Sequence, residues 1–531
     1  MRHAEVLARL DASVLRAWAA RAVERLHVRR GELDELNVFP VADSDTGTNL
    51  YLTLRGGLES VGVEPPDASA EAVGRALTRG TLVGARGNSG VIVSQYLGAL
   101  LAALPQTETV DGAGLVKGLR RAAEAAYGAV GHPIEGTVLT VARAVGEGAE
   151  RMLQRRRGAL DVLEAGIDAG YAALGRTTQQ LAALREANVF DAGAWGLLLV
   201  LDALADAVAG PSRTASRSER VPRVQSQRGR NAAVEEAAPC AGHDHDAGEF
   251  EVMYLVTEGG ELAGGEPGAV ADGLRAALSR VGESVAVVGG GGLWQAHVHT
   301  DHPLDAIGAA ASVGVEASQI RIRHIASQAG VHGLRQPRLG LVTVTAAPGL
   351  AADLARAGAV VVLVLGRVAG PELERAFDDT GAAMVLVLAA DDLLDGAPRA
   401  DLDGPSGHPR VRVRDGLSDV QLVVGTATRA SLDPDLGEDR LADEVVQAID
   451  RMRTATVTAP GVGPGQHDEL VETARGLVAQ GASLLTVLTS VGTPASLVDH
   501  LRAAVASATD GCEVVVLDSG LPGEQVTLGV E

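Results

Sequence analysis

The segment Asn37-Val-Phe-Pro-Val-Ala-Asp43-Ser-Asp45-Thr-Gly-Thr-Asn49-Leu50 decides the fold of this chain. Its two carboxylates, two residues apart, offer hard oxygen ligands to a divalent cation, and the glycine after them lets backbone N–H groups approach a phosphate. The same residue types also favour an N-cap in front of a helix over Leu50–Leu54. An EF-hand does not fit, because loop positions six and twelve, counted from Asp43, hold threonine and leucine.

Three further glycine-rich turns follow along the chain. Gly84-Ala-Arg86-Gly87-Asn88-Ser89-Gly90 directly precedes a helical pattern, so its free N–H groups and the Arg86 guanidinium can bind an anion. Pro133-Ile-Glu135-Gly136-Thr137 and Asn188-Val-Phe-Asp191-Ala-Gly193-Ala-Trp195-Gly196 again place glycine and an acid or hydroxyl before a helix. Each turn alone is also explained by ordinary helix capping. Four such turns in one helical region favour a single nucleotide site built from successive loops.

The sequence around these turns has a helical pattern from residue 1 to residue 210. Apolar residues recur at three- and four-residue spacing, and β-branched alternation is scarce, which predicts an all-α domain. The helical stretches are Leu7–Leu26, Ala70–Thr78, Val91–Leu104, Ala113–Val130, Ala159–Leu174 and Gly196–Val208.

The rest of the chain divides into three regions, so we expect a multidomain protein. Residues 211–249 are rich in Ser, Arg, Gln, Glu and Pro without an apolar period, which is typical of a flexible linker. Residues 250–330 alternate strand and helix patterns and predict a small α+β domain. Residues 338–531 hold short, continuously apolar strands between helices, which predict a largely parallel α/β sheet. Two final strands, over 511–517 and 524–530, are expected to close that sheet.

The composition limits the classes of binding partner and the kind of phosphate site that the chain can have. Of the 531 residues, 46 are basic and 68 are acidic, and the formal charge of −22 argues against binding to nucleic acid or to an anionic membrane. The apolar runs are too short for an integral membrane segment, and two cysteines exclude a disulfide framework, so we expect a cytoplasmic protein. Lys117 is the only lysine and lies outside any phosphate-binding motif. A phosphate site must therefore rely on metal ions, arginine and backbone N–H groups.

The four turns, in this order and spacing, give the chain a resemblance to the ATP-binding subunit of bacterial fatty acid kinase. The first domain of that family shares the fold of the dihydroxyacetone kinase L subunit (DhaL). In the family pattern Asn-Val-Phe-Pro-Val-Pro-Asp-Gly-Asp-Thr-Gly-Thr-Asn-Met, this chain has Ala42, Ser44 and Leu50 at three variable places. Ala194 replaces the second glycine of the family's Asp-Ala-Gly-Gly-x-Gly pattern. The resemblance implies an eight-helix barrel with ATP at its mouth and two magnesium ions between carboxylates and phosphates.

The resemblance also implies roles for individual residues. Asp43 and Asp45 would hold magnesium, with Asn37 at the position of another acidic ligand in the dihydroxyacetone kinases. Asp43, Asp45 and Arg86 would be the catalytic residues. The nucleotide would be bordered by other residues of the four turns, namely Thr46, Gly47, Thr48, Asn49, Gly87, Asn88, Ser89, Gly90, Gly136, Thr137, Asp191 and Gly193.

The middle domain resembles the family in the segment Leu293–Pro303, where His297 and His299 lie two residues apart and so share one strand face. The resemblance suggests a zinc ion at these histidines. However, Met253 stands where the family often has a cysteine, and the other candidate ligands lie in the linker-like stretch, at Cys240, His243 and His245. A zinc ion is therefore possible but not favoured, and a hydrogen-bonded strand face is the alternative.

The resemblance implies a fatty-acid-kinase-like phosphotransferase subunit that passes the γ-phosphate of ATP to a fatty acid carboxylate presented by a DegV-type fatty-acid-binding protein. The composition agrees with a separate carrier, since aromatic residues make up only 2% of the chain and no segment has the pattern of an acyl tunnel. Two alternatives stay open: dihydroxyacetone-kinase-like (glycerone kinase) transfer to another acceptor, and a non-catalytic scaffold whose nucleotide site regulates assembly. The acceptor and the oligomeric state, including a homodimer, are not fixed by the sequence.

Overall fold

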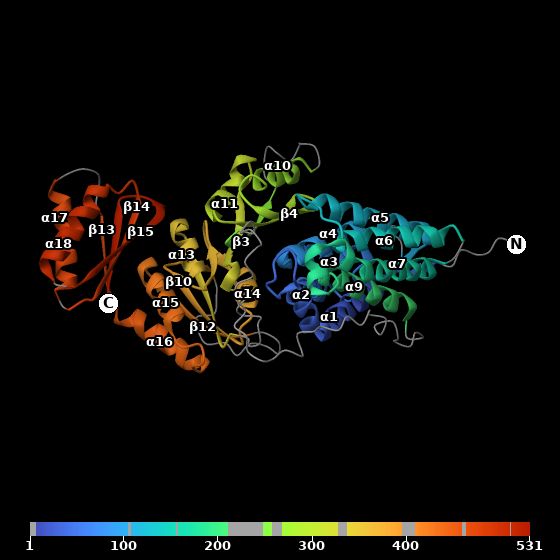
Figure 1. The fold of residues 1–531 in the computed structure, drawn as a ribbon, viewed down its shortest axis with the longest axis horizontal. Coiled ribbons are helices and arrows are strands. Elements are labelled where there is room, and N and C mark those ends of the chain that lie inside the picture. Colours follow the sequence, from blue (N-terminus) through green and yellow to red (C-terminus); the bar gives the residue numbers. More distant parts are fainter. Residues whose placement is uncertain are drawn as a thin grey trace. The chain divides into compact units, whose positions relative to one another are not determined.

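The computed structural model describes residues 7–104, 108–155, 158–210, 248–257, 268–327, 337–395, 409–458, 464–479, 481–509 and 511–531. Two compact units are present, and neither is a single stretch of sequence (Figure 1). Unit 1 comprises residues 1–248, 255–300 and 309–316, and unit 2 comprises 249–254, 301–308 and 317–531. Strand β3 (Phe250–Thr257) and helix α11 (Pro303–Ser312) are each divided between the two units. All but the last two residues of the predicted linker lie outside the described residues.

The first part of unit 1 is helical, as the apolar spacing predicts. Its helices are α1 (Ala12–Glu35), α2 (Thr46–Val63), α3 (Ala70–Gly84), α4 (Gly87–Ala103), α5 (Gly112–Ala129), α6 (Val138–Leu153), α7 (Ala159–Gln180), α8 (Ala182–Ala187) and α9 (Ala192–Ala209). Nine helices are thus described in place of the eight expected, because the six-residue α8 forms a separate turn before Asn188, which has a left-handed backbone. A two-residue ladder pairs β1 (Ala8–Arg9) with β2 (Thr109–Val110).

Helix α9 lies at the centre of these helices. It is buried along nearly its whole length and packs against α1, α2, α6 and α7. The indole Nε1–H of Trp18, on α1, donates to the Val200 carbonyl at 2.9 Å. The outer helices bury one face each, which is the amphipathic pattern read from the sequence. Among the described residues, α9 alone is long and apolar enough to cross a membrane, with a mean hydropathy of 1.6, but 83% of it is buried inside the structure. The sequence did not lead us to expect such a segment, and its burial makes it the core helix.

Unit 1 also contains an antiparallel hairpin of β4 (Glu283–Gly290) and β5 (Leu293–Thr300), with helix α10 (Ala269–Leu278) packed against it. The hairpin is hydrogen-bonded to the helical part of the same unit. Ala286 forms a β-bridge with Val130, and the Gly131 N–H donates to the Val285 carbonyl at 3.0 Å. The hairpin therefore belongs to the structure that surrounds the predicted turns.

The main sheet of unit 2 has the parallel core that continuously apolar strands predict. Its strand order is β12 (Arg410–Leu417), β10 (Met384–Ala390), β7 (Leu339–Thr345), β8 (Val360–Leu363) and β6 (Ala317–His324). The first four strands are parallel, and β6 pairs with β8 in the antiparallel direction. Strands β7 and β10 are buried throughout, which is the environment that favours unbroken runs of valine and leucine.

Helices of unit 2 lie against this sheet, and short elements join its strands. The helices are α13 (Ala351–Arg356), α14 (Gly370–Asp379), α15 (Asp419–Ser431) and α16 (Glu438–Arg451), with the 3-10 turn η5 (Pro348–Leu350) and the two-residue strands β9 (Val368–Ala369) and β11 (Leu394–Asp395). Alternate arginines of β12 pair with aspartates of α16, and the Arg412–Asp443 pair is 2.8 Å long.

The last strands form a second sheet and do not close the first, which corrects the expectation from the sequence. The order in this sheet is β13 (Arg453–Thr458), β16 (Gln525–Val530), β14 (Leu484–Val491) and β15 (Glu513–Pro522). Strand β16 pairs antiparallel with both of its neighbours, whereas β14 and β15 are parallel. Helices α17 (Pro464–Val478) and α18 (Ala495–Ala508) accompany this sheet, which has its own apolar core.

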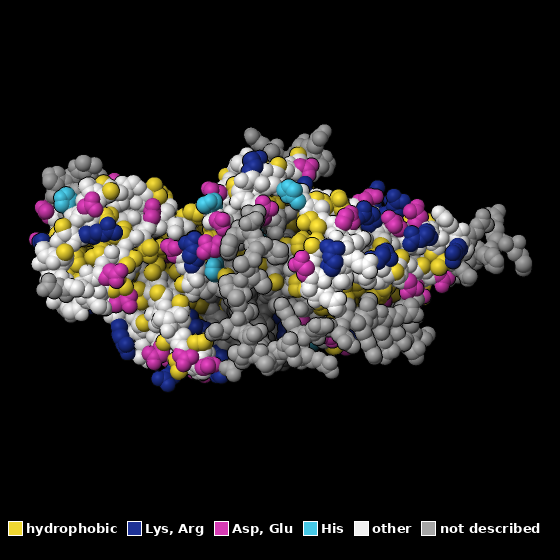
Figure 2. All heavy atoms as spheres, in the orientation of Figure 1, with side chains coloured by type: hydrophobic (Ala, Val, Ile, Leu, Met, Phe, Trp, Pro, Cys, Tyr) yellow, Lys and Arg dark blue, Asp and Glu magenta, His cyan; other side chains and the backbone are white. Residues whose placement is uncertain are grey.

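Charged side chains are mixed by sign on the helical surface of unit 1. Figure 2 shows basic and acidic side chains side by side on the face drawn, although the chain as a whole carries a formal charge of −22. Several of these are neighbours on one helix, such as Glu71 and Arg75 of α3. Such exposed pairs contribute little to stability.

Candidate functional site

A cavity of about 360 Å³ in unit 1 lies where four helices begin. Its lining includes Thr46 at the start of α2, Ser89 in the first turn of α4, Val138 at the start of α6 and Ala192 at the start of α9. The first N–H groups of a helix have no partner within it, and the helix dipole makes this end positive. Four such ends around one cavity favour a ligand that carries several negative charges. We call this space the helix-start cavity.

The helix-start cavity brings together residues from all four predicted turns. The predicted site residues that line it are Asn37, Thr46, Asn88, Ser89, Thr137, Asp191 and Gly193. Asp43 and Asp45 do not line it but lie beside residues that do. Asp45 directly precedes Thr46 and is 7% exposed, and the Asn37 amide donates to the Asp43 carboxylate.

Asn37 stabilises the loop between α1 and α2 through side-chain hydrogen bonds. Its amide N–H also donates to the Val41 carbonyl at 3.2 Å, and its oxygen accepts from Thr46 Oγ1 at 2.7 Å. Between the two carboxylates, Ser44 has a left-handed backbone with φ of 57°, where the family pattern has glycine. Asn37 thus links three parts of this loop, at Val41, Asp43 and Thr46, by side-chain hydrogen bonds.

Asp34 is a half-buried acid beside this site that was not predicted from the sequence. It accepts from the Thr48 N–H and from Thr48 Oγ1, each at 2.9 Å. Burial raises the pKa of Asp34 to about 6, the bonds from Thr48 oppose that rise, and the charge of Asp45 adds to it. No motif marks Asp34, because it lies inside α1 and the pattern begins three residues later. Thr48 therefore holds the start of α2 onto α1.

The glycines of the first two turns allow α2 to approach α1 on one side and α4 on the other. A Cβ atom on Gly47 would clash with the Arg30 carbonyl, and one on Gly87 would clash with the Asn49 amide. Gly87 also has a φ of 52°, which a side chain disfavours. Gly90 packs against Thr53 in the same way. These residues shape the wall behind the helix-start cavity.

Arg86 is 2% exposed and points into the turn that it begins. Its Nη1 donates to the Gly84 carbonyl at 2.8 Å and to the Ala85 carbonyl at 3.3 Å, and its backbone N–H donates to Thr53 Oγ1 at 3.1 Å. Arg86 is not among the described residues that line the helix-start cavity. As placed, its guanidinium fixes the turn before α4.

Residues at the starts of α6 and α9 form another part of the wall of the helix-start cavity. Thr137 is the N-cap of α6, and the Gly136 before it has a φ of 84° and donates its N–H to Thr140 Oγ1. Asp191 is the N-cap of α9 and accepts from the Ala194 N–H at 2.7 Å. Burial raises the pKa of Asp191 to about 6, although bonds from Ala194 and Val138 oppose the rise.

The last two turns meet the second one at Gly193. A Cβ atom there would lie 3.5 Å from both Asp191 Oδ1 and Ser89 Oγ. The same Cβ would lie 3.8 Å from the Cβ of Val138, which directly follows the third turn, so the second, third and fourth turns meet at this point.

One wall of the helix-start cavity was not expected from the sequence. Glu283, Ser284 and Val285, at the start of β4, line it together with His132. These residues belong to the predicted middle domain, and their pattern was read only as a strand. The Gly131 N–H bond to the Val285 carbonyl brings them to the site, and such a long-range pairing leaves no local signal in the sequence.

His297 and His299 lie on β5, and both are buried, with ring centroids 5.0 Å apart. The shared strand face that the spacing predicts is therefore present. Met253 of β3 is buried. The other proposed zinc ligands, Cys240, His243 and His245, lie outside the described residues.

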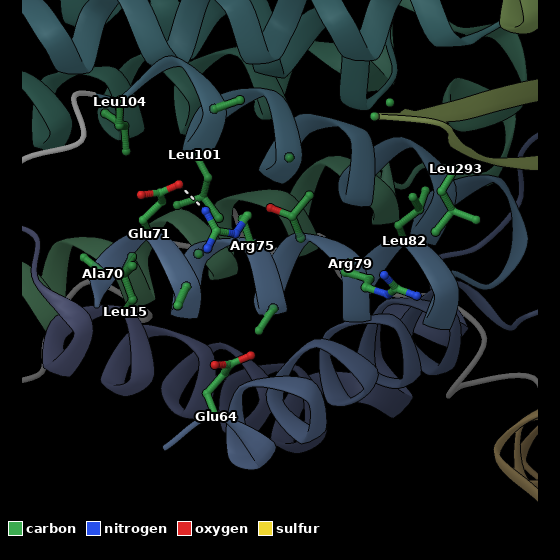
Figure 3. A pocket seen from close by; sticks show the side chains of 18 of the residues that line it. Leu15, Glu64, Ala70, Glu71, Arg75, Arg79, Leu82, Leu101, Leu104 and Leu293 are labelled. Atoms are coloured by element: carbon green, nitrogen blue, oxygen red, sulfur yellow. Dashed lines mark hydrogen bonds and ion pairs between the residues drawn. The ribbon is translucent and has the colours of Figure 1, made fainter. Parts of the chain in front are cut away.

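A second cavity of about 760 Å³ lies beside α3 in unit 1, and we call it the α3 cavity. Figure 3 shows leucines from several elements around it, together with Arg75, which is paired with Glu71, and Arg79. None of the predicted site residues lines this cavity within the part of the chain that the structure describes.

Two family descriptions match this chain. Residues 40–206 match the DAK2 domain, and residues 247–331 match the FakA-like middle domain of fatty acid kinase. The first match begins at Pro40, within the first turn, and covers the other three turns in full, and the second covers the β4–β5 hairpin.

Curated relatives match over different lengths. Protein YloV of Bacillus subtilis is 29% identical over 386 residues, which is 70% of this chain and 67% of YloV. An uncharacterized protein of Staphylococcus epidermidis is 30% identical over 279 residues, which is 51% of this chain and 48% of that protein. The uncharacterized protein SAB1090 of Staphylococcus aureus is 36% identical over 178 residues, which is 34% of this chain and 32% of that protein. The chain thus spans about half, or less, of the length of these staphylococcal relatives.

Two solved structures share limited similarity with the chain. A DegV family protein of Corynebacterium glutamicum has a TM-score of 0.27 and 11% identity, over 36% of this chain and 97% of that chain. The dihydroxyacetone kinase from C. freundii in complex with AMP-PNP and Mg2+ has a TM-score of 0.27 and 21% identity, over 39% of this chain and 36% of that chain.

Proposed function

This chain combines a DAK2 domain with a FakA-like middle domain and belongs to the YloV-like family; from that premise we propose that it is the ATP-binding subunit of a phosphotransferase. The proposed reaction transfers the γ-phosphate of ATP to a fatty acid carboxylate, which a separate DegV-type lipid-binding protein presents. The observation that carries the proposal is the convergence of four helix starts and a paired-carboxylate loop on one cavity.

The residues present fit a magnesium nucleotide. Phosphate oxygens would meet backbone N–H groups at the start of α4, where no side chain caps the helix and where Asn88 and Ser89 line the cavity. At the starts of α2, α6 and α9, the Asp34 and Asp191 carboxylates already accept from the N–H groups of Thr48, Val138 and Ala194. Asp43 and Asp45 offer carboxylate oxygens, the ligands that magnesium prefers, and Asn37 orients Asp43. Magnesium, when bound, supplies positive charge that offsets the charge of the phosphates. Lys117 is exposed on α5, within the helix, so a lysine does not take part.

The proposal of a separate carrier rests on the size and lining of the site. A cavity of about 360 Å³ is within the usual range for a small ligand but leaves no room for a nucleotide and a long acyl chain together. The core of the helical region is filled by its own apolar side chains. A carrier that exposes only the carboxylate would bring the acceptor to the γ-phosphate without an acyl tunnel in this chain.

The test is phosphate transfer by the purified full chain. With MgATP and fatty-acid-loaded DegV-type proteins, we expect acyl phosphate, trapped with hydroxylamine, and little product when the carrier is omitted. Asp43→Asn is the matched control and should give no product with the carrier. Rapid phosphorylation of free fatty acid without a carrier would refute the need for a partner. A wild-type chain that binds no MgATP would refute the proposed function altogether.

A further inference from the structure

Strand β5 reaches the second predicted turn through one buried side chain. Gln295 is 1% exposed, and its Nε2–H donates to the Ala85 carbonyl at 3.1 Å. Ala85 ends α3 and directly precedes Arg86, after which α4 begins. Within the described residues, no donor reaches the Oε1 atom of Gln295. The hydrogen bond to Ala85 is therefore the one polar contact described for this side chain.

The Ala85 carbonyl is also an acceptor for Arg86, at the weaker distance of 3.3 Å. Its orientation decides where the next peptide groups point, because α4 starts two residues later. Asn88 and Ser89, in that first turn, line the helix-start cavity. A change in the orientation of the Ala85 peptide would therefore also move the backbone N–H groups of Asn88 and Ser89, which are proposed to bind a phosphate.

The Gln295 bond lies close to the α3 cavity. Figure 3 shows Leu82 of α3 and Leu293 of β5 at one end of that cavity, and Ala85 and Gln295 follow these leucines by three and two residues. A residue that borders a cavity has fewer atoms to hold it in place. The Gln295 bond therefore adds a directional contact to the packing of the hairpin on α3 and α4.

We propose that Gln295 is a positioning residue for the helix-start cavity, which holds the Ala85 peptide so that the start of α4 presents its N–H groups to a phosphate. This inference rests on the proposed function, since it assigns Gln295 to the phosphate-binding turn. It also makes the predicted middle domain part of the nucleotide site through a second element, besides the wall formed by β4.

The chain offers a matched control in Gln95. Its Oε1 accepts from the Gly289 N–H at 2.9 Å, so it also joins the hairpin to α4, but within the helix and away from the turn. Gln295→Met and Gln95→Met each replace a side-chain amide by a thioether of similar size. Each change removes one hydrogen bond between the β4–β5 hairpin and the helices. Because Gln295 is fully buried and the Gln95 bond is only partly buried, a purely structural role predicts that any loss of MgATP affinity in either variant follows its loss of stability.

The experiment measures MgATP affinity, kcat and the unfolding midpoint of the full-length variants. We expect Gln295→Met to weaken MgATP binding roughly tenfold, the scale of one buried hydrogen bond, while Gln95→Met binds as the wild type does. Both variants should unfold at similar denaturant concentrations. If Gln295→Met does not fold, Gln295→Asn retracts the same amide by one methylene and should weaken binding in the same direction.

Equal MgATP affinities in the Gln295 and Gln95 variants would overturn the inference, as would losses of affinity that only follow losses of stability. Failure of the proposed function looks different, since the wild-type chain itself would then bind no MgATP or transfer no phosphate.

Discussion

The buried carboxylate of Asp191 should make the apo protein less stable than it could be at neutral pH. Its side chain caps α9 from a position that is 7% exposed, and burial raises its pKa from 3.8 to about 6. In Asp191→Asn, an amide oxygen still accepts from the Ala194 N–H, but no charge is buried. We therefore expect this substitution to stabilise the protein, although it alters a proposed nucleotide-binding residue.

The size and the sign of the expected change in the free energy of unfolding follow from the pKa of Asp191. A raised folded-state pKa means that the folded protein holds the proton more tightly, so its contribution to stability is complete below pH 4 and is lost as the pH rises to about 6. Above that range, the shift of about two pKa units corresponds to about 3 kcal/mol. This value already includes the hydrogen bonds that the carboxylate accepts from Ala194 and Val138. The gain of Asp191→Asn at pH 7.5 is therefore about 3 kcal/mol, and it should vanish near pH 4.

Tryptophan fluorescence during urea denaturation, without nucleotide, measures this gain. All three tryptophans of the chain, Trp18, Trp195 and Trp294, belong to unit 1, so the signal reports the unit that contains Asp191. Asp111→Asn is a suitable control, because Asp111 makes the same bond to Gly114 at 2.7 Å from a half-buried position on α5. An Asp191→Asn variant that is no more stable than the wild type at pH 7.5, or whose advantage is the same at pH 4, would refute the reasoning.

Further substitutions test the loops of the site. Asp43→Asn and Asp45→Asn should each abolish phosphate transfer while circular dichroism shows an intact helical fold; unchanged magnesium-ATP affinity in calorimetry, together with unchanged turnover, would contradict the assignment. Arg86→Ala should raise the activation free energy of transfer by roughly 1–3 kcal/mol, the scale of a lost hydrogen bond from a charged donor, because the Gly84 and Ala85 carbonyls before α4 are released; wild-type kinetics would show that the guanidinium is dispensable. Ser44→Gly should stabilise unit 1 by about 1 kcal/mol, because glycine adopts the left-handed backbone of this position without strain. The MgATP affinity should not change. A variant that is less stable than the wild type in denaturant titrations would show that the Ser44 backbone is not strained.

The parts of the fold that depend on local pattern could be predicted from the sequence. The helices of unit 1 follow the spacing of apolar residues, and the parallel strands β7 and β10 follow from unbroken apolar runs. The extra helix α8 could not be predicted, because one turn of helix carries no amphipathic period. The second sheet was missed as well, since a strand such as β16 has the same pattern whichever sheet it joins.

The candidate site also contains residues that the sequence predicts and residues that it does not. The four turns were recognisable because glycine and acidic residues stand at helix starts, and the helix-start cavity gathers residues from each of them. Asp34 was missed because a single acid within a helix looks like any solvated residue, although it is half-buried and accepts from Thr48. Ser284 and Gln295 were missed for a further reason: their roles depend on how the hairpin pairs with helices far away in the sequence.

The interleaving of the two units along the chain constrains the order in which the protein can be made and folded. During synthesis, the helices of unit 1 emerge first, but the wall of the cavity formed by Glu283–Val285 leaves the ribosome only after the first strand of unit 2 has already appeared. That strand, at Glu249–Tyr254, lies beside β6 (Ala317–His324) of the same unit, which is translated only after the hairpin. Domains that are contiguous in sequence fold one after another as they emerge. Here the wall of the helix-start cavity is translated between two neighbouring strands of unit 2, so the folding of unit 1 and the start of unit 2 must overlap in time.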